Sequence, residues 1–301
     1  MSRRCARARP PVDAEAGPAG QVSGAPAVLT GATSGIGRWI ALGLADAGRP
    51  LLLLGRDAAR LAALADWVGL RVAGAQVETV AADLSCLAEV RAAAGLIRTR
   101  TARLGLLVNN AGLLSPHRVL TGEGIERTLA VNHLAPFVLT RSLLPALAAT
   151  PGARIINVGS STSDRARIDP DDLQLARGWR MTRAYARSKL ALLMASRVLA
   201  AETGNTGPAV LVAHPGTVAT SLVREPASAR IAWRLMAPFL LSERQGADTP
   251  LHAALAPTLP GPSGSYLKKR RPVAPNPLAL DPALCRRVVA ATERLARPWL
   301  D

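Results

Sequence analysis

Residues 30–37 read TGATSGIG, and this glycine-rich octet decides how the rest of the chain is interpreted. The apolar run at residues 27–30 predicts a buried strand leading into it, and the apolar spacing over residues 38–47 predicts a helix after it. A strand, a glycine-rich turn and a helix in this order are typical of a site for the pyrophosphate of a dinucleotide, because the helix N-terminus points its amide groups at the anion. The alternative is a turn of the same composition without a ligand.

The three glycines of the octet have different expected roles. Gly31 permits the tight turn, Gly35 lets the backbone approach phosphate, and Gly37 lets the helix pack closely on the strand. The spacing G-x-x-x-G-x-G is more specific than the common G-x-G-x-x-G. The other residues of the expected cofactor-binding turn are Thr33, Ser34 and Ile36.

Strand-like and helix-like segments alternate along the chain from residue 27. The expected strands are residues 27–30, 51–54, 76–82, 105–109, 154–158, 209–213 and 264–267. The expected helices are residues 38–47, 58–68, 88–101, 124–148, 181–201 and 282–296. This alternation predicts a single α/β domain of the Rossmann type, in which helices cover both faces of a doubly wound parallel sheet and ligands bind outside the carboxyl ends of the strands.

Three segments fall outside this alternation. Residues 1–26 are rich in Ala, Gly, Pro and Arg without apolar periodicity, so we expect a disordered basic arm before a domain that spans residues 27–301. Prolines and short apolar runs interrupt residues 221–262, and insertions of this kind can form substrate lids. The basic run at residues 268–271 predicts a solvated loop.

The formal net charge of +16 raises the alternative of binding to nucleic acid or to an acidic membrane surface. The basic residues are scattered, however, and aromatic residues make up only 3% of the chain, too few for stacking on bases. Only three of the 37 basic residues are lysines, which indicates a bias of composition towards arginine. We therefore expect no specific nucleic-acid partner, although the charge could attract a phosphorylated cofactor.

Targeting and redox signals are weak. No stretch of about 18 uncharged apolar residues is present, so we expect no membrane span. The basic N-terminus is not followed by a hydrophobic segment, which argues against a secretory signal and favours the cytoplasm. Cys5, Cys86 and Cys285 are far apart and lack metal-ligand spacing, so we expect free thiols and no metal site.

The end of the strand at residues 51–54 is the place where a dinucleotide fold selects its cofactor. An acidic residue there would favour NAD, but the chain has Gly55 followed by Arg56, whose guanidinium suits a 2′-phosphate. Arg38, just after the last glycine of the octet, could add a second positive charge. Asp57 is expected to cap the next helix. We therefore predict a preference for NADP(H).

Residues 185–189 read YARSK and carry the candidate acid–base pair. On a helix, Tyr185 and Lys189 lie on one face a turn apart, so the phenol and the ammonium can address the same substrate and cofactor ribose. A tyrosine titrates near 10, and we expect the nearby cation to stabilise its phenolate. An ordinary pair on a helix surface is the alternative, but lysine is so scarce in this chain that its presence here favours a specific role.

The octet, the Tyr-x-x-x-Lys pair and the run NNAG at residues 109–112 together resemble the short-chain dehydrogenase/reductase family, over residues 27 to about 294. The resemblance implies that Asp83, followed by Leu84, contacts the adenine ring of the cofactor; a helix N-cap is the alternative for Asp83. The residues that the resemblance implies for shaping the cofactor pocket and steadying the central sheet are Asn110, Ala111 and Gly112.

The resemblance also implies the residues of the reacting centre, to which Tyr185 and Lys189 belong. Ser160, at the end of a run NVGS, matches the serine that hydrogen-bonds the substrate carbonyl oxygen, and Ser161 is the alternative for that role. Asn132 matches the helix asparagine that helps to hold a chain of water to the lysine. The neighbouring His133 is expected to be structural, because the Tyr-Lys pair already supplies the acid–base chemistry.

The run HPGTVAT at residues 214–220 matches the family's P-G-x-V-x-T after the sixth strand. There the resemblance implies contacts with the carboxamide of nicotinamide, which would fix the ring face that delivers hydride. The residues concerned are Pro215, Gly216, Val218 and Thr220.

Within the family, the chain is similar to the retinol-dehydrogenase-like branch. The support comes from EGIE ahead of VNHL, from the triplet HPG, and from the wide gap between Ser160 and Tyr185. Gly159 replaces the serine usual in that branch, a change that we expect to be harmless. The similarity implies an NADP(H)-dependent oxidoreductase that interconverts a fairly apolar aldehyde or ketone and its alcohol. A non-catalytic sensor or scaffold that binds the nucleotide is the alternative, and homo-oligomers formed through the long helices are an expectation from the family.

Overall fold

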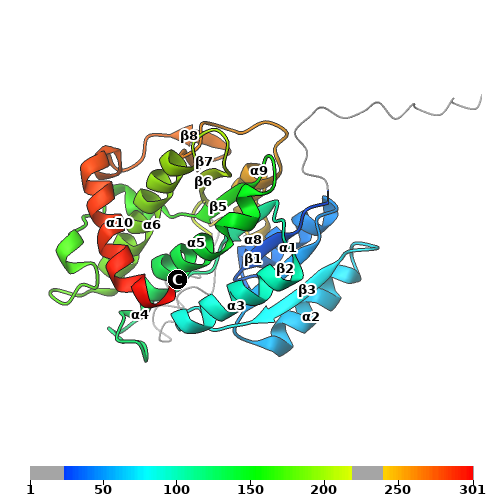
Figure 1. The fold of residues 1–301 in the computed structure, drawn as a ribbon, viewed down its shortest axis with the longest axis horizontal. Helices are drawn as coiled ribbons and strands as arrows, with labels where there is room; N and C mark the ends of the chain where they lie inside the picture. The colour runs from blue at the N-terminus through cyan, green and yellow to red at the C-terminus, as the bar shows by residue number, and fades with distance from the viewer. Residues whose placement is uncertain (1–23, 219–239, 301) are drawn as a thin grey trace, which may run out of the picture.

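Residues 24–218 and 240–300 are described by the computed structural model of the chain (Figure 1). The predicted arm at residues 1–26 lies almost entirely outside the described residues, as do Thr220 and much of the segment at residues 221–262. Within the described part of the chain, no helix combines the length and the apolarity that crossing a membrane requires.

The fold is built on one eight-stranded sheet in the order β3-β2-β1-β4-β5-β6-β7-β8. The strands are β1 (Ala27–Thr30), β2 (Leu51–Gly55), β3 (Val77–Ala81), β4 (Leu106–Asn109), β5 (Arg154–Val158), β6 (Ala209–His214), β7 (Tyr266–Lys268) and β8 (Arg271–Val273). Neighbouring strands are parallel except β7 and β8. The strand order reverses between β1 and β4, and their carboxyl ends flank the place where such sheets bind ligands. The predicted Rossmann-type architecture is thereby confirmed.

Helices cover both faces of this sheet (Figure 1). The first group is α3 (Leu87–Arg100), α5 (Ala135–Ala148), α6 (Met181–Thr203) and α10 (Pro282–Ala296), and the second is α1 (Ile36–Asp46), α2 (Ala58–Gly69) and α9 (Asp248–Leu255). The strands are apolar throughout because side chains alternate between two buried faces. In β2, for example, Leu52 and Leu54 join the core under the first group, whereas Leu51 and Leu53 join the core under the second.

The predicted helix at residues 124–148 begins later and is interrupted. A short α4 (Arg127–Leu129) leads into a π-helical segment, η1 (Ala130–Leu134), and then into α5. Glu126 is extended and caps the start, because its carboxylate accepts a hydrogen bond of 2.8 Å from the amide of Leu129. Pro136 cannot donate the α-helical hydrogen bond to the carbonyl of Asn132, which favours a wider turn there. The π-helical turn carries Asn132, one of the predicted catalytic residues.

The last strand forms a hairpin that the sequence did not predict. Lys268 ends β7 and Arg271 begins β8, so the predicted solvated loop at residues 268–271 is confirmed only for the two exposed turn residues between the strands. The two residues between them, Lys269 and Arg270, have φ angles of +48° and +65°. Positive φ at both central residues is the conformation of a two-residue hairpin turn, which usually selects Asn or Gly, and neither residue occurs here.

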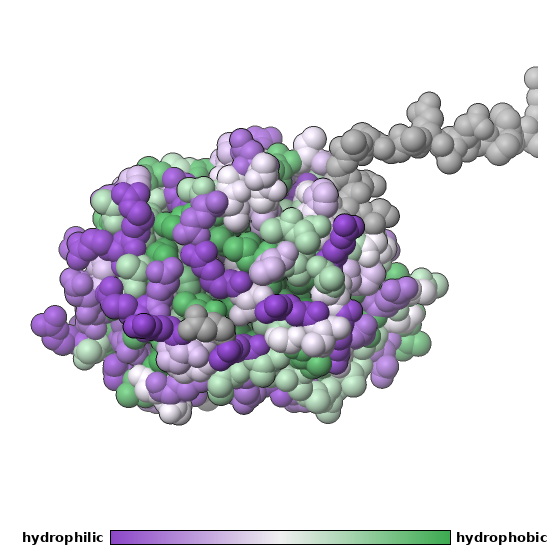
Figure 2. Space-filling model, in the orientation of Figure 1, coloured by the Kyte–Doolittle hydropathy of each residue, from purple (hydrophilic) through white to green (hydrophobic). Residues whose placement is uncertain are grey.

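The surface carries its charge in a dispersed pattern. On the face shown in Figure 2, hydrophilic residues are spread over the surface with hydrophobic residues between them. This agrees with the scatter of arginines along the sequence.

Candidate functional site

The glycine turn between β1 and α1 is built as tightly as the sequence predicts. Gly31 has a φ of +69°, and a Cβ atom on it would lie 2.7 Å from the Cα of Ala111. A Cβ atom on Gly37 would lie 2.2 Å from the carbonyl oxygen of Gly31. Gly35 has a φ of +59° and is the N-cap residue of α1, whose first amide groups donate no hydrogen bond to a described side chain. The first amide groups of α1 are therefore available to an anion.

The loop after β4 is hydrogen-bonded to this turn. The hydroxyl of Thr30 accepts from the amides of Asn110 and Ala111, at 3.1 and 3.0 Å. The side-chain amide of Asn110 in turn donates to the carbonyl of Gly31 at 3.0 Å. Thr30 was not predicted as a site residue, although it is the first residue of the octet. These bonds hold the glycine turn and the loop after β4, the two sides of the expected cofactor site, in fixed positions relative to each other.

The end of β2 presents positive charge next to the glycine turn. Arg56 is exposed there, and Asp57 caps α2 by accepting from the amide of Arg60 at 3.0 Å, as expected. The guanidinium of Arg60 donates to the carbonyl of Thr33 at 3.0 Å, so this residue reaches the expected phosphate site although the sequence did not single it out. The sequence could have pointed to Arg60, because it lies four residues after Arg56 in the first turn of a helix.

Arg38 lies elsewhere on the surface of α1. Its guanidinium stacks over the ring of Trp67, 4.0 Å from the ring centroid. Trp67 belongs to the second half of α2, whereas the predicted 2′-phosphate position is at the N-terminal end of that helix beside Arg56. In this arrangement Arg38 is held by a cation–π contact and Arg60 is the cation that touches the glycine turn.

The residues after β3 are placed in a turn. Asp83 accepts hydrogen bonds of 2.8 and 2.9 Å from the amide and hydroxyl of Ser85. The N-cap position of α3 is Cys86, so the alternative of a helix N-cap for Asp83 is wrong. The side chain of Leu84 is buried in the core below α3.

The predicted reacting centre is brought together at the carboxyl end of β5. Tyr185 and Lys189 lie on α6, Ser160 follows β5, and 25 residues of sequence separate the serine from the tyrosine. The phenol of Tyr185 is close enough to the Ser160 side chain for that hydroxyl to affect its pKa. The ammonium of Lys189 is buried, lies 6.0 Å from the centroid of the Tyr185 ring and donates to the carbonyl of Val158 at 2.8 Å. Ser161, the alternative to Ser160, is exposed.

Burial controls the ionisation of this centre. It raises the pKa of Tyr185 above its ordinary value, and the hydrogen bond with Ser160 opposes this only in part. It also lowers the pKa of Lys189 to about 8. Desolvation of the phenol is thus the larger effect on Tyr185, and the ammonium of Lys189 donates its hydrogen bond to a backbone carbonyl. At neutral pH the phenol is protonated, as a proton donor must be.

Asn132 is wholly buried and ties three segments together. Its side-chain oxygen accepts from the amide of Leu113 at 2.8 Å, and its nitrogen donates to the carbonyl of Leu113 at 2.9 Å and to the hydroxyl of Ser188 at 3.0 Å. A Cβ atom on Gly112 would lie 3.4 Å from the Asn132 oxygen and 3.5 Å from the Lys189 nitrogen. Asn132 thus lies beside the lysine, and its side chain positions the loop after β4 against α6. Ser188, the partner on α6, was not predicted.

The segment after β6 approaches the same edge of the sheet. Gly216 has a φ of +86°, and a Cβ atom on it would lie 2.4 Å from the side chain of Leu241. Pro215 is half-buried and Val218 is buried, where it pairs with Leu241 in an isolated bridge. Thr220, the remaining residue of the predicted nicotinamide contact, is outside the described residues.

Gly159 is more constrained than we expected. A Cβ atom at this position would lie 2.8 Å from the side chain of Val212 and 3.3 Å from the ring of Tyr266. A serine would therefore have to displace a buried neighbour, so the glycine is required by the packing of β5 against β6 and β7.

The long insertion between Ser160 and Tyr185 is held by α6 itself. Arg187 lies within the YARSK motif, is buried, and donates to the carbonyl of Asp172. Asp172 belongs to a short 3₁₀ turn, η3 (Pro170–Asp172). Arg187, which stands between the tyrosine and the lysine of the motif, thus ties the insertion to α6 next to the reacting centre.

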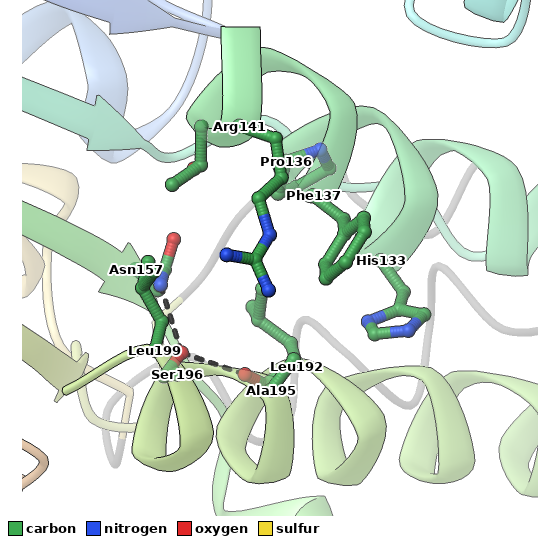
Figure 3. A pocket seen from close by; sticks show the side chains of 10 residues that line it. His133, Pro136, Phe137, Arg141, Asn157, Leu192, Ala195, Ser196 and Leu199 are labelled. Atoms are coloured by element: carbon green, nitrogen blue, oxygen red, sulfur yellow. Dashed lines mark hydrogen bonds between the residues drawn. The ribbon is translucent and has the colours of Figure 1, made fainter. Parts of the chain in front are cut away.

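A pocket between α5 and α6 is lined by none of the predicted catalytic residues (Figure 3). His133, Phe137, Arg141 and Ser196 are among its lining residues. His133 is buried, and its Nε2 atom lies 2.7 Å from the hydroxyl of Thr292 on α10. Burial lowers the pKa of His133 to about 3, so the imidazole is neutral. These contacts support the structural role expected for His133.

No metal-binding group is found in residues 24–218 and 240–300. Clusters of three or more His, Cys, Asp or Glu side chains that could hold an ion are absent from these residues. Their two cysteines, Cys86 and Cys285, are free thiols.

Comparisons with known proteins complete the description of the site. A family model described as short chain dehydrogenase matches residues 25–230. Over 258 residues the chain is 36% identical to retinol dehydrogenase 12 of Homo sapiens, covering 85% of this chain and 82% of that protein. Over 277 residues it is 36% identical to polyprenol dehydrogenase of Mus musculus, covering 89% and 83%. A solved structure of a blue fluorescent protein from a metagenomic library, in complex with NADPH, matches at 29% identity with a TM-score of 0.63, covering 81% of this chain and 95% of that one.

Proposed function

Because the chain belongs to the short-chain dehydrogenase/reductase family, in its retinol-dehydrogenase-like branch, we propose that it is an NADP(H)-dependent oxidoreductase interconverting a fairly apolar aldehyde or ketone and its alcohol. The observation that carries the proposal is the convergence of Ser160, Tyr185 and Lys189 beside the glycine turn. Three side chains from two distant segments share one edge of the sheet with an uncapped helix N-terminus, where a dinucleotide would bind.

The nicotinamide supplies or accepts the hydride when it is bound, and the residues of the chain handle the oxygen and the proton. Thr162 donates to the Ser160 oxygen at 3.0 and 3.3 Å, so the η2 turn (Ser161–Arg165) does not take up the Ser160 proton, and that proton can be donated to a substrate oxygen beside Tyr185. Such a donor stabilises the charge that grows on the oxygen as hydride arrives. Tyr185, protonated at neutral pH, would then give its proton to that oxygen.

Lys189 would take part both in proton transfer and in binding of the cofactor. Its buried ammonium donates to the carbonyl of Val158, which leaves two of its three protons for other partners such as ribose hydroxyls. Because the pKa of Lys189 is lowered to about 8, this group can exchange a proton near neutral pH more readily than an exposed lysine.

Preference for NADP(H) rests on the end of β2. Arg56 stands where an acidic residue would bind the ribose hydroxyl of NAD, and the Arg60 guanidinium touches the glycine turn from the same helix start. The NADPH carried by the structural relative at 29% identity supports the same choice. An apolar substrate is favoured by the printed names of the curated relatives, a retinol and a polyprenol dehydrogenase.

Oxidation of NADPH with a panel of aldehydes and ketones of increasing chain length tests the proposal, together with reduction of NADP by the matching alcohols. The Tyr185→Phe variant should lose at least about 100-fold in turnover, and Ser160→Ala about 100-fold, while both still bind NADPH. Ser161→Ala is the matched control, because the exposed neighbouring hydroxyl should leave turnover unchanged. Normal turnover by Tyr185→Phe would refute the assignment, and a wild-type protein that binds NADPH but reduces no carbonyl would favour a sensor.

A further inference from the structure

An ion pair that belongs to none of the predicted site residues lies next to the reacting centre. The ammonium of Lys268 pairs with the carboxylate of Asp164, and both side chains are about two-thirds buried, with exposed fractions of 29% and 32%. Lys268 ends β7 and is the register partner of His214, so it stands at the carboxyl edge of the sheet. Its nitrogen also lies 5.2 Å from the ring centroid of Tyr266.

Asp164 belongs to the 3₁₀ turn that Ser160 begins. This turn, η2 (Ser161–Arg165), has Ser160 as its N-cap residue. The carbonyl of Ser160 accepts from the amide of Ser163 at 3.1 Å and from its hydroxyl at 2.6 Å. The Ser160 hydroxyl accepts from Thr162 in the same turn. The orientation of the Ser160 side chain is therefore set by the turn rather than by β5 alone.

The turn is held by a side chain from the C-terminal part of the chain as well. The amide of Asn276 donates to the carbonyls of Ser163 and Ala166, at 2.8 and 2.9 Å. Asn276 supports the far end of the turn, and the Lys268–Asp164 pair ties it to β7. A partly buried ion pair of this kind fixes geometry more firmly than an exposed pair, because water competes less for both charges.

We propose that the Lys268–Asp164 ion pair is a positioning element for the reacting centre: it holds the η2 turn so that the Ser160 hydroxyl points at the substrate oxygen. The proposal rests on the proposed function. A hydrogen bond to developing charge depends steeply on geometry, so release of the turn lowers kcat. Lys268 is the register partner of His214, next to the predicted nicotinamide segment, but neither residue of the pair is hydrogen-bonded to the glycine turn or to the end of β2. We therefore expect the Kd for NADPH, which the contacts to the phosphates dominate, to stay at the wild-type value.

The same hairpin supplies a matched control. Arg270, two residues after Lys268, pairs with Asp248 at the start of α9, and its Nε atom donates to that carboxylate at 2.8 Å. This pair is more exposed, at 57% and 41%, and connects to no residue of the η2 turn. A change at Arg270 therefore tests whether any loss of charge on the hairpin has the same effect.

The kinetic experiment measures four variants of the ion pair: Lys268→Met, Asp164→Asn, Lys268→Arg, and a double variant that combines Asp164→Lys with Lys268→Asp and so exchanges the two charges. Arg270→Met is the control. We expect kcat to fall about tenfold or more in the first two, with the Kd for NADPH unchanged, and to recover in the conservative and exchanged variants. Arg270→Met should match the wild type. Wild-type kcat in Lys268→Met, or an equal fall in Arg270→Met, would overturn the proposal.

Hydrogen exchange measured by mass spectrometry tests the positioning step without turnover. Amides in residues 160–166 should exchange faster in Lys268→Met than in the wild type, and at the wild-type rate in Arg270→Met. Unchanged exchange in Lys268→Met overturns the proposal. If the wild type reduces no carbonyl, the proposed oxidoreductase function is wrong. Faster exchange of residues 160–166 in Lys268→Met would still show that Lys268 holds the turn.

Discussion

Acid should destabilise this protein in part through one wholly buried histidine, His133. The Thr292 hydroxyl donates to the carbonyl of Val288 at 2.8 Å, so it accepts from the Nε2–H of His133. The Nδ1 atom of His133 is then unprotonated, and it is buried without a partner among the described atoms. Protonation of Nδ1 would place an unpaired charge in the core between α5, α6 and α10, which is why burial lowers the pKa of His133 to about 3.

The size of the effect follows from the two pKa values. An unfolded chain takes up this proton as the pH falls through 6.5, whereas the folded protein does so only near pH 3. The contribution of neutral His133 to stability is therefore fully present above pH 6.5 and is lost as the pH falls below it, at about 1.4 kcal/mol per pH unit. Between pH 7 and pH 5 the free energy of unfolding should drop by about 2 kcal/mol from this residue.

Urea unfolding followed by tryptophan fluorescence measures this drop. The variant His133→Gln keeps an amide that can donate to Thr292 and cannot titrate in this range. The wild type should lose about 2 kcal/mol more than the variant between pH 7 and pH 5. His214, whose pKa burial lowers to about 4, titrates in both proteins and cancels in the comparison. An equal loss in the two proteins would refute the reasoning.

Two further predictions concern the cofactor site. Gly37→Ala should weaken NADPH binding at least about 100-fold in a fluorescence titration, because the new Cβ atom would lie 2.2 Å from a backbone carbonyl of the glycine turn. Gly69→Ala, at a helix position with open space around it, should bind as the wild type, and normal binding by Gly37→Ala would mean that the turn can relax. Arg56→Ala should weaken NADPH binding about 10-fold to 100-fold while leaving NADH binding unchanged, since only NADPH carries the 2′-phosphate. Equal effects on the two nucleotides would contradict the role given to Arg56.

Much of the fold and of the candidate site could be predicted from local patterns. Continuous apolar runs such as β1 and β2 arise because both faces of a parallel sheet are covered, so their period and spacing are visible in the sequence. The glycines of the octet are required because the backbone there has positive φ angles or approaches other backbone closely. A glycine in the sequence is itself the signal for such a position. Tyr185 and Lys189 could be named as candidates from the spacing of a short motif, and Ser160 from the resemblance to the family.

Contacts between distant segments could not be predicted in this way. Three such contacts join residues up to 104 positions apart: Arg60 with Thr33, Lys268 with Asp164, and Asn132 with Ser188. The local sequence does not indicate which of the many arginines or lysines will contact a given distant residue.

The sequence by itself determined the order of the strands from β1 to β7, the shape of the glycine turn and the candidate reacting groups, because these depend on periodicity, on short motifs and on the conformational range of single residues. Only the tertiary structure decided how the groups are held and how they ionise. Burial raises the pKa of Tyr185 and lowers that of Lys189, and desolvation depends on all the segments that pack around a group. The β7–β8 hairpin and the π-helical turn at Asn132 likewise depend on neighbouring elements, since their own residues favour a loop and an ordinary helix.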